Sequence, residues 1–184
     1  KKTIVFIDSE IGEDNKIKDL GAVYENGTEF HSASISGFNQ FLSDGEYICG
    51  HNILRHDWKY ISPMLLPNAQ FIFIDTLFLS PLMFPQRPYH SLLKDEKLIS
   101  EELNNPLSDA KKAKKLFYDE VNAFLALDHS VKTIYYSLLS SQDEFCGFFR
   151  YTEFSEKCDD TAAVIRKTFF GKICENADLP ALIL

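Results

Sequence analysis

The stretch that most constrains the fold is residues 3–10, TIVFIDSE, because it joins an apolar run directly to two carboxylates. Residues 3–7 are β-branched or apolar, which predicts a strand buried on both faces. The run ends in Asp8 and Glu10. Side chains two positions apart on a strand point to the same face, so both acids would leave one side of the sheet. Two like charges held this close are costly unless a cation lies between them, which favours a metal site. The ordinary alternative to a metal site is two unrelated acids at a solvated strand end.

The composition indicates a globular protein that does not enter a membrane. The chain has 184 residues, of which 45% are hydrophobic, enough for one core and a small appended unit. No apolar run approaches the length of a membrane span and no signal-peptide pattern opens the chain, so we expect a cytoplasmic protein. Because Lys1 and Lys2 directly precede the first strand and the chain ends in ADLPALIL, we expect a domain of a longer protein.

Charge and cysteine content restrict the possible partners. The formal net charge is −8, which repels nucleic acid on average. A nucleic-acid partner would therefore have to be held by local basic residues and by metal ions. The four cysteines have no CxxC spacing, which favours reduced core thiols over a zinc site. They are Cys49, Cys146, Cys158 and Cys174.

The predicted elements follow an α/β order. An Asn26-Gly27 turn joins two strands that we expect to pair with the first in antiparallel fashion. We expect strands over 3–7, 19–24, 28–34, 47–49 and 71–74, and helices over 38–42, 53–65, 76–83, 106–124, 131–139 and 161–175. Asn52 and Asn105 are the expected N-caps of the second and fourth of these helices. The type of the aromatic-rich segment 145–154 stays open, and residues 89–97 have a short helical pattern.

Two further acids occupy helix positions on or beside the predicted apolar stripes, where a carboxylate without a partner is unfavourable. Asp57 falls on the inward stripe of the helix predicted over 53–65, and Asp109 falls in the first turn of the longest helix. Alone, Asp57 could pair with a lysine, and Asp109 could complement the positive end of a helix. Together with Asp8 and Glu10 they form a set of hard oxygen donors on separate elements, which is what two Mg²⁺ or Mn²⁺ ions require.

In this order, the segments resemble the motifs of the DEDD superfamily of 3′–5′ exonucleases, the DnaQ-like proofreading family. FIDSE is similar to the first motif, GHNILRHD to the second and NNPLSDAKKAKKLF to the third, with DLGAVY, IDTLFLSPLMFP and PYHSLLKD similar to the segments between them. The resemblance implies a ribonuclease H-like mixed five-stranded sheet flanked by helices over residues 1–128. Residues 129–184 would be a mainly helical C-terminal extension packed on it.

The resemblance also implies a site. Asp8, Glu10, Asp57 and Asp109 would bind two Mg²⁺ or Mn²⁺ ions, and Ile11, Gly12, His51 and Asn52 would hold the terminal nucleotide. The substrate would be a nucleic-acid 3′ end, for which we favour single-stranded DNA over RNA. Domains of this kind are attached to helicases or polymerases and serve DNA repair, so we expect such a neighbour.

The chain departs from the family at the position of the general base. Asn104 stands where the main branch has a histidine, and Asn105 where the other branch has a tyrosine. Asparagine has no proton-accepting state near neutral pH. A slow enzyme, an enzyme with a substitute base such as His90, and a module that only binds nucleic-acid ends or a protein partner all remain open. The lysines within 111–115 fit a solvated helix face better than a phosphate track.

This departure generates a prediction. Asn104→His would place an imidazole of near-neutral pKa beside Asp109, the acid of the third motif. If the site is otherwise complete, nuclease activity should rise by up to ~10²–10⁴, the range typical of a general base. The pH–rate profile should gain an acid limb that the parent protein lacks. An unchanged rate with metal binding intact would favour the binding module.

Overall fold

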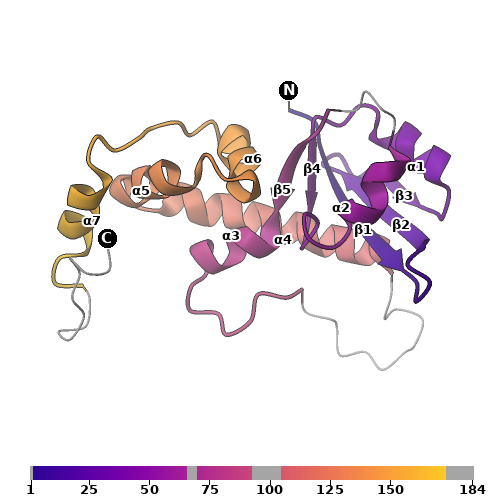
Figure 1. Cartoon of the computed structure of the whole chain (residues 1–184), viewed down its shortest axis with the longest axis horizontal. Coiled ribbons are helices and arrows are strands. Elements are labelled where there is room, and N and C mark those ends of the chain that lie inside the picture. Colours follow the sequence, from indigo (N-terminus) through magenta and orange to yellow (C-terminus); the bar gives the residue numbers. More distant parts are fainter. Residues whose placement is uncertain (1, 66–69, 93–104, 173–184) are drawn as a thin grey trace.

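The chain is an elongated α/β molecule with a sheet at one end and a group of helices at the other (Figure 1). The computed structural model describes residues 2–65, 70–92 and 105–172. One long helix, α4 (Pro106–Ala126), runs alongside the sheet and continues into the helical end. This helix therefore ties the two ends of the molecule together.

The sheet has five strands in the order β3-β2-β1-β4-β5. The central strand β1 (Ile4–Ile11) pairs antiparallel with β2 (Ile17–Tyr24), which pairs antiparallel with β3 (Glu29–His31). On its other side β1 pairs in parallel with β4 (Tyr47–Gly50), followed by β5 (Ile72–Asp75). The predicted mixed five-stranded sheet is thereby confirmed, and its order and strand directions are those of a ribonuclease H-like sheet.

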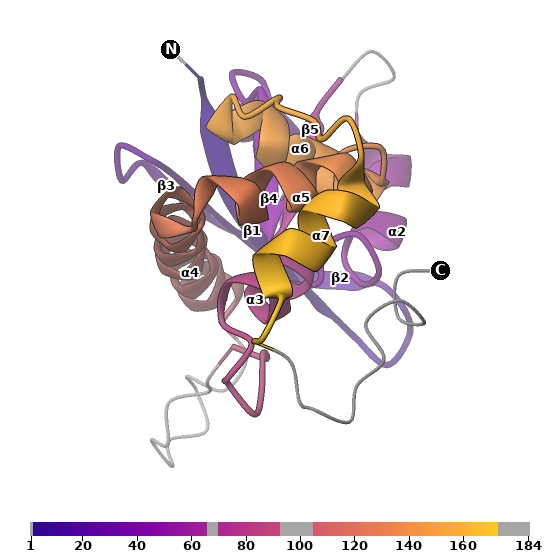
Figure 2. The ribbon, with the colours of Figure 1, turned by 90° about the vertical axis from the view of Figure 1, so that its left-hand side faces the viewer.

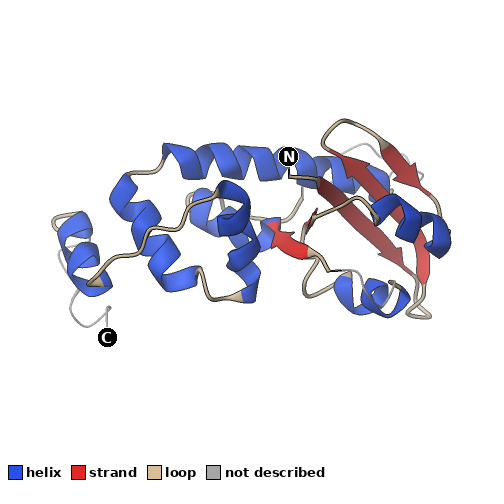
Figure 3. Cartoon of the chain, turned by 90° about the horizontal axis from the view of Figure 1, so that it is seen from above, coloured by secondary structure: helices blue, strands red, loops and turns tan. Residues whose placement is uncertain are grey.

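The helices cover both faces of the sheet. Besides α4, they are α1 (Ile35–Leu42), α2 (Trp58–Ile61) with the 3₁₀ turn η1 (Ser62–Met64), α3 (Thr76–Met83), α5 (His129–Leu139), α6 (Asp143–Thr152) and α7 (Thr161–Phe169). Seen from above, α1 and α2 lie on one side of the sheet and α4 on the other (Figure 3). The helix α3 matches its prediction, and the open segment 145–154 is largely helix α6.

The first strand is buried on both faces, as its apolar run predicts. Ile4 and Phe6 belong to the hydrophobic cluster on the side of α3, α4 and α6, whereas Val5 and Ile7 belong to the cluster that contains Phe38 of α1. All four strand residues are at most 1% exposed. Because side chains alternate along a strand, the even-numbered residues that follow Phe6 also face the α4 side.

The helix predicted over 53–65 begins later and is shorter. Asn52 does not cap it: this residue has φ = +64°, and α2 starts only at Trp58. The chain from His51 to Asp57 forms turns. The reason is the carboxylate of Asp75, which accepts hydrogen bonds from the backbone N–H groups of Asn52 (2.8 Å) and Leu54 (3.1 Å) and so holds these residues in a turn.

The helical end continues the packing of the sheet. Helix α6 lies against β5, where a Cβ on Gly147 would come within 1.9 Å of the carbonyl oxygen of Phe73. Beyond it, α5 and α7 pack on each other (Figure 2). The last helix among the described residues, α7, ends at Phe169, before the predicted residue 175. Whether residues 129–184 form a separate unit stays a prediction. Among the described residues, no helix combines the length and apolarity that crossing a bilayer would need.

The start of α4 approaches the sheet through a glycine. Gly21 of β2 lies opposite Asp8 of β1, and a Cβ there would fall 2.1 Å from the backbone nitrogen of Leu107. It would also fall 2.2 Å from the carbonyl carbon of Pro106. Since both clashing atoms belong to backbone, no side-chain rotation could relieve the overlap. The lack of a side chain at position 21 thus lets the first turn of α4 dock beside Asp8.

We therefore expect Gly21→Ala to displace the first turn of α4. Overpacking of a close contact costs about 1–3 kcal/mol in the free energy of unfolding, and this contact should lie at the upper end. Urea denaturation followed by circular dichroism measures the loss. Gly37→Ala is the matched control, because Gly37 lies within helix α1 and a Cβ there would meet only side-chain atoms, the nearest at 3.2 Å. Equal stability of the Gly21→Ala variant and the parent would refute the close docking.

Candidate functional site

Asp8 and Glu10 lie within β1 and not beyond its end, because the strand extends to Ile11. The pairing of β1 with β4 stops at Phe6 and Cys49, while the pairing with β2 continues past Glu10. Both acids therefore project from the part of β1 that has lost its parallel neighbour. Such an opening at the carboxyl end of a strand is a common place for a site in α/β sheets.

Negative charge gathers around Asp8. Burial, followed by the charges of Asp57, Asp109 and Glu10, raises the pKa of Asp8 from 3.8 to about 8, with Lys112 acting in the opposite direction. The carboxylates predicted from three separate segments thus lie within electrostatic reach of Asp8. A half-buried carboxylate with three others nearby favours a bound proton or a bound cation at neutral pH.

Asp57 is held at this site by its neighbour on β1. It is 3% exposed, and its Oδ1 accepts hydrogen bonds from the backbone N–H of Ser9, at 3.1 Å, and from the Ser9 hydroxyl. Its Oδ2 lies 3.7 Å from Nδ1 of His56. Burial raises the pKa of Asp57, while the hydrogen bonds from Ser9 oppose that rise. Ser9, which sequence reasoning did not single out, therefore orients the third acid.

Asp75 is a second residue that sequence reasoning missed. It is fully buried, and its carboxylate caps α3 by accepting a hydrogen bond from the backbone N–H of Leu77 at 2.9 Å. The same carboxylate accepts a hydrogen bond from the backbone N–H of Asn52 in the turn after β4. Burial raises the pKa of Asp75. The signal was present in the sequence, because an aspartate directly between an apolar strand and a helix is a typical N-cap. Its role is to fix the turn that leads to Asp57.

Asp109 comes from the first turn of α4, as predicted. Asn105 caps the helix, its Oδ1 accepting from the backbone N–H of Ser108 at 3.0 Å. Lys112, one turn further, forms an ion pair with Asp109 at 3.0 Å, and both side chains are 28% exposed. Asp109 therefore stands at the edge of the group of acids, in contact with a lysine. Asn104, the residue at the general-base position, lies outside the described residues.

The predicted nucleotide-holding residues lie on two different loops. His51 follows β4, and its Nδ1 hydrogen-bonds Thr76 Oγ1 at 2.9 Å. Burial lowers the pKa of His51 to about 4, against the influence of Asp109. Ile11 ends β1, and the Gly12 N–H closes a tight loop onto the carbonyl of Lys16 at 2.9 Å. His51 thus lies near the acids, whereas Gly12 belongs to a loop that is closed on itself.

The acids fit a metal centre in chemistry, but their side chains are not arranged around an ion. Within residues 2–65, 70–92 and 105–172, no three His, Cys, Asp or Glu side chains are grouped closely enough to hold one. The donor set consists of carboxylates, which suit Mg²⁺ and Mn²⁺. At Asp8, burial and the neighbouring carboxylates outweigh the charge of Lys112, so the pKa of Asp8 is raised. The residues present therefore fit divalent cations, provided that the side chains rotate on binding.

Comparisons with known proteins give a distant structural likeness. No protein-family model matches the chain, and no curated protein matches its sequence. A solved structure that resembles it is the family B DNA polymerase from the hyperthermophilic archaeon Pyrobaculum calidifontis, with a TM-score of 0.44 and 13% identity over 85% of this chain. The chain covers 30% of that polymerase. A likeness this distant identifies neither a family nor an activity.

The raised pKa of Asp8 predicts a specific dependence of stability on pH. A carboxyl whose folded-state pKa lies above its unfolded value stabilises the fold fully below the unfolded value, and this stability is lost as the pH rises through the folded value. For Asp8 the window runs from about pH 4 to about pH 8. In a chelating buffer, Asp8→Asn should therefore unfold at a temperature several degrees above that of the parent at pH 8, and at a similar temperature at pH 4. Melting curves across this window test it; a difference that does not change with pH would contradict it.

Proposed function

We propose that this chain is a metal-dependent 3′–5′ exonuclease domain that hydrolyses phosphodiester bonds at the 3′ ends of single-stranded nucleic acid. The observation that carries the proposal is the convergence of Asp57, Asp109 and Glu10 on Asp8, from the turn before α2, the first turn of α4 and β1 of a sheet of ribonuclease H-like order. The direction of digestion and the preference for DNA over RNA rest on the resemblance of the sequence motifs.

Asp8, Glu10, Asp57 and Asp109 are the residues that would bind the metal ions. Two divalent ions supply Lewis-acid activation of water and stabilisation of charge on the attacking and leaving oxygens of a phosphate. These residues provide only oxygen donors, which excludes a soft-metal site and matches Mg²⁺ or Mn²⁺. Release of the repulsion around Asp8 would contribute to the affinity, because a bound cation replaces the proton that its raised pKa otherwise retains near neutral pH.

Neighbouring residues limit how far these acids can move. Ser9 fixes one oxygen of Asp57 through two hydrogen bonds, and the second oxygen lies 3.7 Å from Nδ1 of His56, which a cation would have to displace. For Asp109 to bind a cation, its ion pair with Lys112 would have to break. This ion pair is partly exposed and therefore weak. Asp75 keeps the turn after β4 in place through the backbone of Asn52 and Leu54.

Proton transfer is the weak step of this proposal. Among the described residues near Asp109, His51 is uncharged at neutral pH because burial lowers its pKa to about 4. A base of such low pKa is poorly matched to a reaction near pH 7. His90 hydrogen-bonds Ser80 through Nδ1 at 2.9 Å, which engages one of its two ring nitrogens. With asparagine at position 104, we therefore propose low activity, in which the metal ions alone activate the water.

A binding module is the second candidate. Asn104 favours it, because the same fold without an efficient base would still engage a nucleic-acid end or a protein partner. The presence of all four acids favours the enzyme, since partly buried carboxylates that repel one another destabilise a protein that has no use for a cation. The neighbouring domain, a helicase or a polymerase in our sequence-based expectation, would decide which strand is presented.

A nuclease assay with Mn²⁺ tests the proposal. A 5′-labelled single strand should shorten one nucleotide at a time and release mononucleotides, and a chemically blocked 3′ terminus should prevent this. The Asp8→Asn, Glu10→Gln double variant should lose at least ~10²-fold in rate, because the carboxylates that hold the catalytic ions are removed. Glu13→Gln, which changes an exposed acid on the following loop, is the matched control.

Metal binding provides an independent measurement in the same variants. Millimolar Mn²⁺ should raise the melting temperature of the parent and of Glu13→Gln, as any ligand of the folded state does. It should not raise that of the double variant. Internal cleavage at early times would indicate an endonuclease. An unchanged response to Mn²⁺ in the double variant would show that Asp8 and Glu10 are not ligands.

A further inference from the structure

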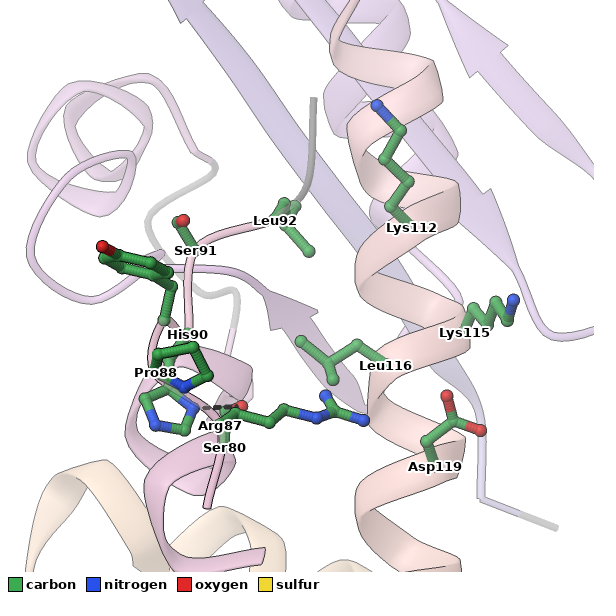
Figure 4. Close-up of a pocket in the computed structure, with 11 residues that line it drawn as sticks. Ser80, Arg87, Pro88, His90, Ser91, Leu92, Lys112, Lys115, Leu116 and Asp119 are labelled. Carbon is green, nitrogen blue, oxygen red and sulfur yellow. Dashed lines mark hydrogen bonds between the residues drawn. The ribbon is translucent and has the colours of Figure 1, made fainter. Parts of the chain in front are cut away.

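A pocket of about 610 Å³ lies between α4 and the loop that follows α3. Its lining includes Arg87, Tyr89, His90, Lys112, Lys115 and Asp119. In Figure 4, Arg87 points from the loop across the pocket toward α4, while Lys112 and Lys115 extend outward from successive turns of that helix. The volume is in the range of pockets that hold a nucleotide-sized ligand.

The lysines within 111–115 divide into two pairs with different surroundings. Lys111 forms an ion pair with Glu29 of β3 at 2.8 Å, and Lys114 donates to the carbonyl oxygens of Tyr24 and Glu25, each at 2.9 Å. These two lysines fasten α4 to the sheet. Because residues three apart share a helix face, Lys112 and Lys115 instead line the pocket together. The pattern is therefore more specific than the solvated face expected from the sequence.

The pocket carries local positive charge in an acidic protein. Among the described residues that line it, three are permanently cationic, Arg87, Lys112 and Lys115, and one is a carboxylate, Asp119. The net charge of the whole chain is −8. Arg87 is held in place by stacking on Phe84, its Cζ lying 3.7 Å from the ring centroid. Such a patch attracts an anion with several phosphates, which the rest of the surface repels.

Tyr89 adds a surface suited to a base. It lines the pocket and is 79% exposed, an unusual state for so large an aromatic side chain. Aromatic rings beside a cationic groove are the features with which proteins bind single-stranded nucleic acid, the ring stacking on a base and the cations contacting phosphates. Lys112 also contacts Asp109, so the pocket begins directly beside the candidate metal centre.

We propose that this pocket binds the single strand a few nucleotides from its 3′ end, with Lys115 and Arg87 on phosphates and Tyr89 stacked on a base. The inference rests on the proposed function for the position of the 3′ end at Asp8. Binding in the pocket itself does not depend on cleavage. The pocket would compensate locally for the unfavourable net charge and position the strand for the acids.

Fluorescence anisotropy with a labelled thymidine oligonucleotide of about 12 nucleotides, in EDTA so that no strand is cut, tests the pocket. Lys115→Gln should weaken binding about 3- to 10-fold and reduce the slope of log K against log salt by about 0.7, as loss of one phosphate contact requires. Tyr89→Ala should weaken binding about 5-fold or more, whereas Tyr89→Phe should bind like the parent. Lys111→Gln is the matched control, since it removes the same charge from the other face of α4.

The outcomes separate this inference from the proposed function. Weakened binding in Lys115→Gln and Tyr89→Ala, with a parent that does not cut when Mn²⁺ is added, would uphold the pocket and contradict the exonuclease. Cleavage by the parent, with unaltered binding in both variants, would uphold the exonuclease and contradict the pocket. The pocket proposal is overturned if the parent does not bind, if Lys111→Gln loses as much affinity, or if a mononucleotide, inorganic phosphate or polyglutamate competes as well as the oligonucleotide.

Discussion

The close docking of α4 on the sheet is the contact on which the remaining features depend. It is possible because Gly21 leaves room for the backbone of Pro106 and Leu107. This contact brings the first turn of α4, and with it Asp109, to the strand that carries Asp8. It also sets the direction in which α4 leaves the sheet. Phe117 and Phe124 can therefore pack against α6 in the hydrophobic cluster on the side of α3, α4 and α6. A single missing side chain thus positions both a candidate ligand and the helical end.

The cost of assembling the acids is offset by different means at each one. Asp57 accepts two hydrogen bonds from Ser9, and Asp75 accepts three from backbone N–H groups. Asp109 is paired with Lys112. At Asp8 no such partner is present among the described residues, and burial and the other carboxylates together raise its pKa to about 8. The structure therefore concentrates the unfavourable energy at the residue where a cation would have the largest effect, which is why Asp8 is the most informative position to change.

Much of the fold could be predicted from the sequence, because apolar runs and caps are local signals. The strand before Asp8, the cap at Asn105 and the helix over 76–83 all follow from residue types within a few positions. The turn at Asn52 could not be predicted, because the carboxylate that shapes it comes from Asp75 on another strand. The same holds for the support of Asp57 by Ser9, 48 residues away in the sequence. Local patterns identified the acids, whereas their hydrogen-bonding partners depended on tertiary structure.

The helix α4 combines tasks that the sequence shows only as an amphipathic pattern. One side carries Lys111 and Lys114, which bind the edge of the sheet, and another carries Lys112 and Lys115, which line the pocket. Asp109 occupies the turn before Lys112, so that lysine can contact either the acid or a phosphate, but not both at full strength. Binding of a strand in the pocket would therefore draw Lys112 away from Asp109 and free this carboxylate for a cation. The two sites would then favour each other's occupancy, because the same ion pair opposes both ligands.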